Sequence, residues 1–353
     1  MADLPIEIPP RSIVIVMLSA LGDAVHVLPV VNALKRFWPS TRITWIIQPV
    51  PHRLVAGHRA VDEFIVFQRR RGTAAARSYR ELHDVLRGRH FDLAINLQVY
   101  LKAGLITALL AADAKLGFDR RRARDLNWLF TTHRIPARPT GHVQDQYFEF
   151  LEHLGVDSQP VEWKIALTRE ERAAQQEFFS ERRRTCAVVV GTSKVEKNWL
   201  PDRYARVMQA LVHDYQMEPI LVGGPSLIER QLADQIKRSS GIALTDALGD
   251  DVRRLVWLLD GADLVLSPDT GPLHTARALD RPVIGLYGYT NPKRYGPYRK
   301  YTELIVDGYA RTPDEDYPLS MEYRPDGKQR ITVDMVMEKV DLAVNRYLKE
   351  PRG

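Results

Sequence analysis

The sequence predicts an α/β protein with two doubly wound, mostly parallel sheets, and three observations lead to this fold class. Apolar segments of the length and β-branched content of buried strands recur along the chain. They begin near Ile13, Ile43, Phe64, Leu93, Ala187, Ile220, Leu264 and Val283. Helical patterns separate most of them, which is the alternation of βαβ units. The 353 residues exceed what one hydrophobic core usually covers, so two domains are expected.

The elements follow in order from local patterns. Ile13 to Leu18 is the first strand, Ser19 to Gly22 a tight turn, and a helix is expected from Asp23 to Pro39 because its apolar residues recur at helical spacing. Further helices are expected at Arg77 to Leu86, Lys102 to Ala112, Val143 to Leu154, Glu170 to Arg184, Asp202 to His213 and Val333 to Leu348.

The domain boundary is expected in a polar, proline-containing stretch, Gly155 to Thr168. Residues 1–160 then form an N-terminal Rossmann-like domain and residues 161–330 a second one. Residues 331–353 form a C-terminal helix.

The most informative segment begins where the strand at Leu264 ends. Ser267 and Pro268 end the strand, and Asp269, Thr270 and Gly271 open a helix. First-turn N–H groups lack partners within a helix, and with the helix dipole they form an anion site suited to phosphate. His274, one turn further on, could donate to the same anion. The alternative is an ordinary turn in which Asp269 only caps the helix.

The whole string from Ser267 to Pro292 resembles the signature of glycosyltransferase family 9, the bacterial lipopolysaccharide heptosyltransferases: Asp-Thr-Gly-x-x-His followed by a Gly-x-Thr-x-Pro turn. The resemblance implies a GT-B architecture, in which two Rossmann-like domains face a cleft. It also implies that Asp269, Thr270, Gly271 and His274 hold the diphosphate of a nucleotide-sugar donor. The C-terminal helix would then pack back on the N-terminal domain.

A second match lies at the end of the first strand, where Ser19-Ala-Leu-Gly-Asp23-Ala-Val-His26 resembles the family motif Ser-x-x-Gly-Asp-x-x-His. Ligands of open α/β sheets bind beyond the carboxyl ends of the strands, which is where Asp23 stands. The resemblance implies that Asp23 is the catalytic base and that Ser19, Gly22 and His26 lie at the acceptor. Without it, Asp23 would be interpreted as a carboxylate that stabilises the helix dipole.

Two more segments extend the donor site. Thr192, Ser193 and Lys197 follow the strand at Ala187 and match a family segment that contacts the donor diphosphate, which makes Lys197 a second catalytic candidate. Hydroxyl groups and a lysine suit phosphate oxygens, although Lys197 alone could be a solvated charge. The family also carries an acidic residue for the donor ribose after the next Gly-rich turn. Ser226 is expected at that position, which weakens the expectation of ADP-heptose.

The acceptor side carries basic residues. Lys102 and Arg124 match family positions near the acceptor, with surface charge as the alternative for both. Arginine runs at 69–71 and 120–122 fall in loops of the N-terminal half, so an anionic glycolipid or glycan acceptor and peripheral contact with an anionic membrane are expected. No helix-turn-helix, RRM, KH or zinc-finger signature supports nucleic acid.

The remaining features exclude other classes. The single cysteine, Cys186, permits no intramolecular disulfide, and no Cys/His spacing indicates a metal site. No signal peptide or membrane-spanning run is visible, so a cytoplasmic protein is expected. Together with these exclusions, the family resemblance implies an inverting, metal-independent glycosyltransferase without a cofactor, with ADP-heptose as donor substrate. A nucleotide-sugar epimerase of the same architecture and a non-catalytic nucleotide-sugar-binding protein remain the alternatives.

Overall fold

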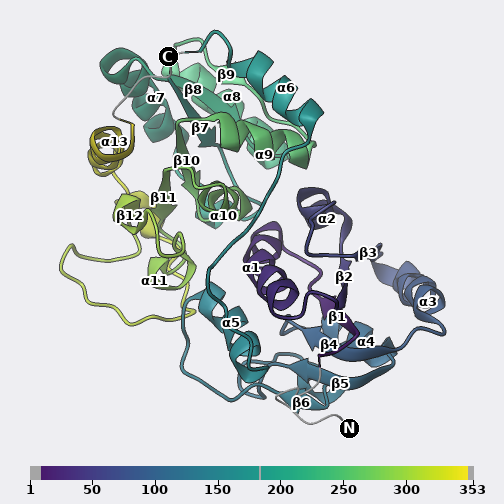
Figure 1. Ribbon diagram of the computed structural model, residues 1–353. Helices are drawn as coiled ribbons and strands as arrows, with labels where there is room; N and C mark the ends of the chain where they lie inside the picture. Colours follow the sequence, from purple (N-terminus) through teal and green to yellow (C-terminus); the bar gives the residue numbers. More distant parts are fainter. Residues whose placement is uncertain (1–8, 183, 349–353) are drawn as a thin grey trace. The chain divides into compact units, whose positions relative to one another are not determined.

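The computed structural model describes residues 9–182 and 184–348, and the chain divides into two units (Figure 1). The first unit runs to residue 139 and includes 143–165. The second comprises 140–142 and the chain from 166 onward. Residue 183 and the predicted helical segment beyond 348 lie outside the described residues.

The first unit is built on a six-stranded parallel sheet with the order β3-β2-β1-β4-β5-β6. Its strands are β1 (Ser12–Val16), β2 (Arg42–Ile47), β3 (Glu63–Val66), β4 (Phe91–Asn96), β5 (Ala112–Gly117) and β6 (His133–Arg134). Its helices are α1 (Leu21–Phe37), α2 (Pro49–Val55), α3 (Ala75–Leu86), α4 (Leu101–Leu109) and α5 (Val143–His153), with 3-10 turns η1 (Gly72–Ala74) and η2 (Asn127–Phe130).

The second unit repeats this plan with the order β12-β11-β10-β7-β8-β9, again all parallel. Its strands are β7 (Thr185–Val189), β8 (Glu218–Val222), β9 (Thr245–Asp246), β10 (Leu264–Pro268), β11 (Val283–Tyr287) and β12 (Ile305–Asp307). Its main helices are α6 (Arg169–Phe179), α7 (Pro201–Tyr215), α8 (Leu227–Ser240), α9 (Val252–Gly261), α10 (Gly271–Ala278) and α13 (Val333–Tyr347). Shorter turns are α11 (Pro292–Tyr295), α12 (Gly327–Arg330), η3 (Val195–Lys197) and η4 (Thr302–Leu304).

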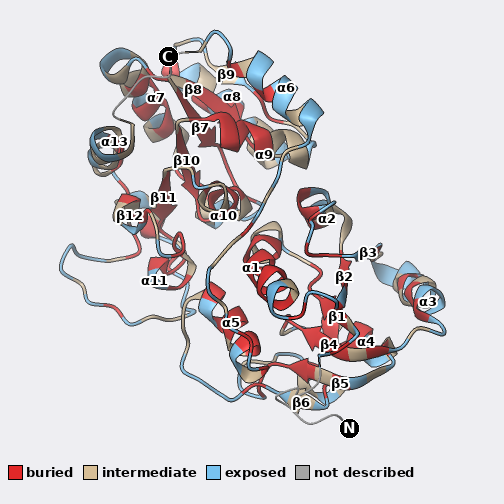
Figure 2. Cartoon of the chain, in the orientation of Figure 1, coloured by how far each residue is buried: buried red, intermediate tan, exposed pale blue. Residues whose placement is uncertain are grey.

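The central strands are apolar because helices cover both faces of each sheet. Figure 2 shows the strands at the centre of each unit in the buried colour, and every residue of β7, β10 and β11 is buried. A strand buried on both faces reads as a continuous apolar run, which is why these segments stood out in the sequence. The predicted fold class, two doubly wound parallel sheets, is confirmed.

Strand order fixes where ligands bind. Counted from the first strand of each unit, both sheets have the order 3-2-1-4-5-6. Successive strands are therefore added in one direction from β1 to β3 and in the other from β4 onward, so the strand order reverses between β1 and β4, and likewise between β7 and β10. Ligands of such sheets bind beyond the carboxyl ends of the strands at this reversal. Most of the segments predicted to carry the site come after one of these four strands; the exceptions are the Ser226 turn, which follows β8, and the segment of Arg124, which follows β5.

Several predicted boundaries were wrong. The segment Ser19 to Gly22 is not wholly a turn, since α1 already begins at Leu21 and ends at Phe37. The helix expected to reach Ala112 ends at Leu109, because β5 begins at Ala112. The helix expected to reach Arg184 ends at Phe179.

The domain organisation also differs from the prediction. The chain up to Ile165 stays with the first unit because polar contacts hold it there: Asn32 Nδ2 donates to Glu162 O at 2.7 Å, and His58 Nε2 lies 2.9 Å from Trp163 O. The C-terminal helix, α13, packs against α7 and β12 of the second unit, and its expected packing on the first domain stays a prediction. Its Val336 and Val340 are fully buried in that unit's core.

Candidate functional site

The predicted site residues form two groups, one at the strand reversal of each unit. In the second unit the centre is Asp269, which directly follows β10 and is 6% exposed. Lys197 Nζ donates to Asp269 Oδ2 at 2.6 Å and to Asp269 O at 3.0 Å. Thr290 Oγ1 donates to the same Oδ2 at 2.5 Å, and His274 Nε2 lies 3.6 Å from Oδ1. Asp269 is therefore a buried anchor for a cation rather than a helix cap.

The charge state of Asp269 follows from these partners. Burial acts to raise the pKa of its carboxyl, but the positive charge of Lys197 and the contact with His274 outweigh it and hold the pKa well below its usual value of 3.8. The carboxylate is ionised at neutral pH. An ammonium has three donors, and two of those of Lys197 serve Asp269, so the third can serve a ligand.

The helix beside this pair is open at its N-terminus, as predicted. Helix α10 begins at Gly271, the last of the three residues expected to open it, and its N-cap Thr270 makes no side-chain cap hydrogen bond. Pro272 stands at the next position and has no N–H to satisfy. The sequence analysis assigned an anion to the N–H groups of this turn, and Lys197 is held beside them through Asp269.

The loop after β7 is folded by its own polar groups. Thr192 N donates to Asn198 Oδ1 at 2.7 Å, and Thr192 Oγ1 both donates to Lys194 O and accepts from Lys194 N. The predicted phosphate ligand Thr192 is thus a buried organiser of the loop, whereas Ser193 and Lys194 are exposed. Lys194 Nζ lies 5.3 Å from the ring centre of Tyr323. The sequence analysis did not name Lys194 as a candidate site residue.

The turn after β8 carries a carboxylate that sequence reasoning missed. Ser226 caps α8 through Glu229 N, and its hydroxyl donates to Glu229 Oε2 at 2.6 Å. Gly224 N donates to Glu229 Oε1 at 2.7 Å. A Cβ on Gly224 would lie 2.9 Å from that carboxylate, so the glycine allows this close approach. The acidic group at the Gly-rich turn is Glu229, supplied by the first turn of α8 and not by position 226.

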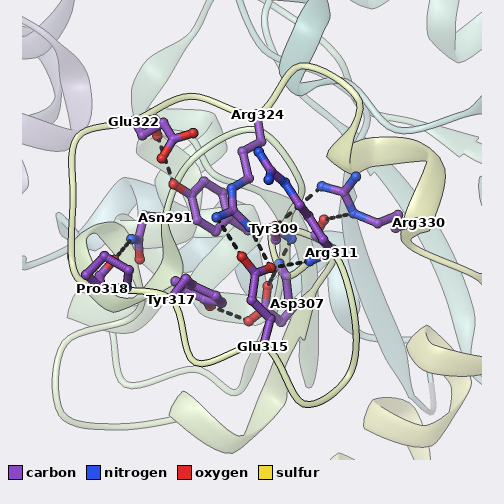
Figure 3. A network of polar contacts seen from close by, with 12 residues as sticks. Asn291, Asp307, Tyr309, Arg311, Glu315, Tyr317, Pro318, Glu322, Arg324 and Arg330 are labelled. Carbon is purple, nitrogen blue, oxygen red and sulfur yellow. Dashed lines mark hydrogen bonds and ion pairs between the residues drawn. The ribbon is translucent and has the colours of Figure 1, made fainter.

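A polar network fixes the long loop between β12 and α12, next to Thr290 (Figure 3). Arg324 donates to both oxygens of Glu315 at 2.8 and 2.9 Å and to Tyr309 O at 2.7 Å. The Asp307 carboxylate accepts from Tyr309 N and from the Tyr317 hydroxyl. At the end of this loop Tyr323 stacks on Tyr289, with ring centres 4.8 Å apart.

In the first unit the central residue is Asp23, in the first turn of α1. Its Oδ2 accepts from Ala20 N at 2.8 Å, and its Oδ1 accepts from the Tyr147 hydroxyl at 3.4 Å. The side chain is half-buried. The backbone contact fixes the orientation of the carboxylate, while Tyr147 of α5 reaches it from another element and was not found in the sequence.

Lys102 lies in the same unit, at the start of α4, and its Nζ donates to Ser19 Oγ at 2.8 Å. Burial and the charge of Arg69 lower the pKa of Lys102 from 10.5, and the carboxylate of Asp23 opposes the shift. Gln98 Oε1 accepts from Leu18 N at 3.2 Å, and Gln98 Nε2 donates to Ser19 O. The structure thus brings three of the predicted residues together: Ser19, Asp23 and Lys102.

The other acceptor candidates lie differently. Gly22 is a residue of α1, and His26 is buried, with Nδ1 2.9 Å from Gln144 Oε1, so it joins α1 to α5. Arg124 is exposed; its N–H donates to Val99 O at 2.7 Å, and its guanidinium lies 5.9 Å from the ring centre of Tyr100.

Among the described residues, one group has metal-ligating geometry: His90, Asp92 and Asp113. It lies at the amino ends of β4 and β5, opposite to the predicted site. No helix of this part of the chain has the length and apolar character needed to span a bilayer.

Two units with this strand order, with Asp269 just before α10 in the second unit and Asp23 in the first turn of α1 in the first, have the GT-B architecture of glycosyltransferases. The chain belongs to glycosyltransferase family 9 (heptosyltransferase), whose model matches residues 79–323. The enzyme is a glycosyltransferase, which sets aside the epimerase and the non-catalytic alternative.

Individual relatives agree. The chain is 31% identical over 309 residues to the lipopolysaccharide core heptosyltransferase OpsX of Haemophilus influenzae, covering 87% of each. It is 27% identical to lipopolysaccharide heptosyltransferase 1 of Escherichia coli, covering 82% of this chain and 89% of the relative. Among solved structures, a family 9 glycosyltransferase from Veillonella parvula matches with a TM-score of 0.79 at 22% identity, over 96% of this chain and 98% of that one. The Escherichia coli heptosyltransferase WaaC with ADP matches with a TM-score of 0.73, 22% identity, and coverage of 94% and 99%.

Proposed function

We propose that this enzyme moves a heptose from ADP-heptose onto a lipopolysaccharide core or related glycan acceptor, with inversion at the anomeric carbon and without a metal ion. The observation that carries the proposal is the Lys197–Asp269 pair beside the uncapped start of α10. The curated relatives named above are lipopolysaccharide heptosyltransferases, which supports the same sugar and acceptor class.

Asp23 acts as the general base. The acceptor hydroxyl gives its proton to the Asp23 carboxylate while its oxygen attacks the anomeric carbon. The bond from that carbon to the diphosphate breaks in the same step, and the electron pair leaves with ADP. A hydrogen bond from Ala20 N holds the carboxylate in one orientation, as a base aimed at a single hydroxyl requires.

The departing diphosphate is stabilised by the second unit. The third donor of Lys197 and the N–H groups of Thr270 and Gly271 meet the charge that develops on the phosphate. His274 adds a further donor through its imidazole N–H, and Asp269 keeps Lys197 in place. Asp269 is therefore a positioning residue, and Lys197 is the group that contacts the substrate.

Glu229 takes the part that the sequence assigned to Ser226. Its carboxylate lies at the Gly223–Gly224 turn after β8, the turn at which the family resemblance led us to expect the ribose of the donor nucleotide. A carboxylate accepts from ribose hydroxyls more strongly than a serine hydroxyl does. This supports an adenosine diphosphate donor.

No metal is needed for this step because fixed cations and N–H groups already face the leaving group. The triplet Asp314-Glu315-Asp316 has the Asp-x-Asp spacing that often binds a metal–nucleotide complex, and the sequence interpretation passed over it. Glu315, however, is engaged by Arg324, and the 98% exposed side chain of Asp316 pairs with Lys293 at 3.1 Å. We expect activity to persist in excess EDTA. Loss that magnesium restores would contradict this part of the proposal.

The base is tested with Asp23→Asn, which preserves an acceptor for Ala20 N but cannot take a proton. We expect transfer to fall by a factor of about 10²–10⁴. ADP affinity, measured by calorimetry, stays unchanged because the nucleotide groups belong to the other unit. The matched control is Asp145→Asn, an acidic residue of α5. Activity of Asp23→Asn within a few-fold of the native enzyme would contradict the assignment.

The donor is tested with ADP, UDP, GDP and dTDP on the native protein and on Glu229→Gln. We expect ADP to bind best and the substitution to weaken it about tenfold, since a hydrogen bond to a charged group contributes about 1.5–3 kcal/mol. Preference for another base would refute the ADP-heptose assignment and leave the fold and family untouched.

A further inference from the structure

The first unit exposes a compact group of large apolar side chains that the reaction does not use. Twelve large apolar side chains are exposed among the described residues, and five of them fall within residues 100–129, so they are not scattered evenly. They are Tyr100, Leu101, Leu105, Leu126 and Leu129, with exposed fractions between 37% and 59%. We refer to these five residues as the α4–η2 patch.

The patch is continuous because α4 and η2 pack on each other. Asn127 Nδ2 donates to Tyr100 O at 2.7 Å, and Arg124 N donates to Val99 O, so η2 is tied to the start of α4. A Cβ on Gly104 would lie 2.6 Å from the ring of Phe130, which shows how closely the two elements approach. Residues from both therefore share one surface.

Leu126 has an unusual backbone for an exposed leucine. Its φ is 60° and its ψ 19°, the left-handed region that favours Gly and Asn. The side chain is nevertheless 59% exposed, so the folded unit gains little from burying it. A leucine at this position costs free energy twice, because its backbone is left-handed and its side chain is exposed to water. Its presence therefore indicates that the side chain contacts something other than the folded unit.

Cations surround the patch. Arg120 and Arg134 lie over the ring of Trp128, with guanidinium carbons 3.9 and 5.4 Å from its centre, and both are exposed. Arg69, Lys102 and Tyr79 line one open cavity of about 490 Å³ with Tyr100, Leu101 and Leu105; Asp125 is the acidic residue in its wall. Apolar side chains with aromatic rings and a basic rim are complementary to the surface of an anionic bilayer.

We propose that the α4–η2 patch docks on an anionic phospholipid bilayer, with the leucines entering the headgroup boundary and the arginines contacting lipid phosphates. The proposal rests on the proposed function only in that a lipid-linked acceptor would be held in such a membrane. Docking itself involves no catalytic step and is measured without an acceptor.

The test uses the full-length protein and two kinds of vesicle, phosphatidylethanolamine with phosphatidylglycerol, and phosphatidylcholine alone. We expect sedimentation with the anionic vesicles only, weakened by salt because surface charges are screened. Leu126→Asn should lower the vesicle affinity about five- to tenfold, from the lost apolar area. Arg120→Gln should lower it about fivefold, the effect of one cation near the surface.

Matched controls separate docking from folding. Leu227→Asn removes a 72% exposed leucine, and Arg238→Gln an exposed arginine, both from α8 of the second unit; neither should change vesicle binding. Asn suits the left-handed backbone, so Leu126→Asn should keep or raise the melting temperature, and Leu129→Ser gives a second variant should it not fold.

Three outcomes would overturn the proposal: equal binding to both vesicles, no effect of Leu126→Asn and Leu129→Ser, or a dimer in sedimentation that these variants dissociate. The last would make the patch a contact between two copies of the chain. Calorimetry with ADP keeps the two proposals distinguishable. A protein that docks but does not bind ADP would refute the donor assignment alone, and one that binds ADP but not vesicles would refute docking alone.

Discussion

The two units share one strand order and place their functional residues at the same point of it, yet they treat charge in opposite ways. In the second unit the carboxylate of Asp269 is buried among Lys197, His274 and Thr290, and each contact compensates its burial. In the first unit Asp23 is half-buried and Lys102 is partly desolvated beside another cation. In the second unit the charge of Asp269 is neutralised by neighbouring groups of the protein. In the first unit the charges of Asp23 and Lys102 remain partly exposed, where a ligand can reach them.

The pKa shifts express the same difference. Lys197 and His274 hold the pKa of Asp269 low, so its ionised form stabilises the folded second unit. Burial and Arg69 lower the pKa of Lys102, so its charged form destabilises the folded first unit. A charge kept at a cost to stability indicates function, while a compensated charge can be structural as well. This is consistent with a preformed pocket for a small nucleotide and an open surface for a large acceptor.

The largest effect should come from the compensated site. Asp269→Ala leaves Lys197 beside a cavity without its carboxylate, and removing one partner of a buried ion pair costs about 3–5 kcal/mol. We expect a lower urea midpoint and weaker ADP binding, measured by fluorescence and calorimetry. The matched control is Asp316→Ala, whose side chain is 98% exposed and pairs with Lys293; it should be nearly neutral. Equal losses of stability and ADP affinity in the two variants would show that a buried, paired carboxylate contributes no more than an exposed one.

A pH series sharpens the same contrast. Because the folded pKa of Asp269 lies below its usual 3.8, the carboxylate contributes its full stability above that value and loses it as the pH falls towards the folded pKa. The stability of the native protein should therefore fall more steeply than that of Asp269→Asn between about pH 5 and pH 3. Urea midpoints across this range measure the difference. If the urea midpoints of the native protein and of Asp269→Asn fall in parallel with pH, Asp269 keeps its ordinary pKa.

A smaller and local effect is expected at the loop shown in Figure 3. Arg324 holds Glu315 and the backbone at Tyr309, so Arg324→Leu should release the loop while the sheet stays intact. Amide hydrogen exchange should quicken in residues 309–323 and remain slow in β10 and β11. Lys300→Leu, which removes a surface partner of Asp280, is the control and should leave the loop protected. Faster exchange throughout the second unit would show that Arg324 supports the core and not the loop.

How far the sequence predicted the site depends on whether a residue acts within its own segment. Asp23 and Asp269 each stand at the junction of an apolar strand and a helix, and both junctions are visible in a short stretch of chain. Thr290 and Tyr147 reach them from elements 21 and 124 residues away, and only folding brings those side chains close. Glu229 was missed because its helical turn carries it back to the Gly-rich turn, three residues beyond the position that spacing suggested.

The same reasoning applies to the fold. Central strands covered on both faces are long apolar runs and were found. The edge strands β6 and β9 have two residues each, too few for a pattern. Strand β5 begins Ala-Asp-Ala, which has little β propensity, and so it was partly assigned to the preceding helix. The position of α13 could not be inferred from its own amphipathic pattern, because an apolar stripe does not specify which unit it covers.

The smallest effect, and the one opposite in sign, is expected at Lys102. Since its folded pKa lies below the usual 10.5, the charged side chain disfavours folding at neutral pH, and the cost disappears as the pH rises through the folded pKa. Lys102→Met should thus raise the melting temperature at pH 7 by about 1–2 °C and lose this gain near pH 10.5. Transfer to the acceptor should decline while ADP affinity is retained, which a structural role would not produce. The matched control is Lys115→Met, at another lysine of the first unit whose pKa burial lowers; it should change stability in the same direction without changing transfer. A lower melting temperature for Lys102→Met at pH 7 would mean that its bond to Ser19 stabilises the fold, and the proposed difference between the two units would fail at this residue.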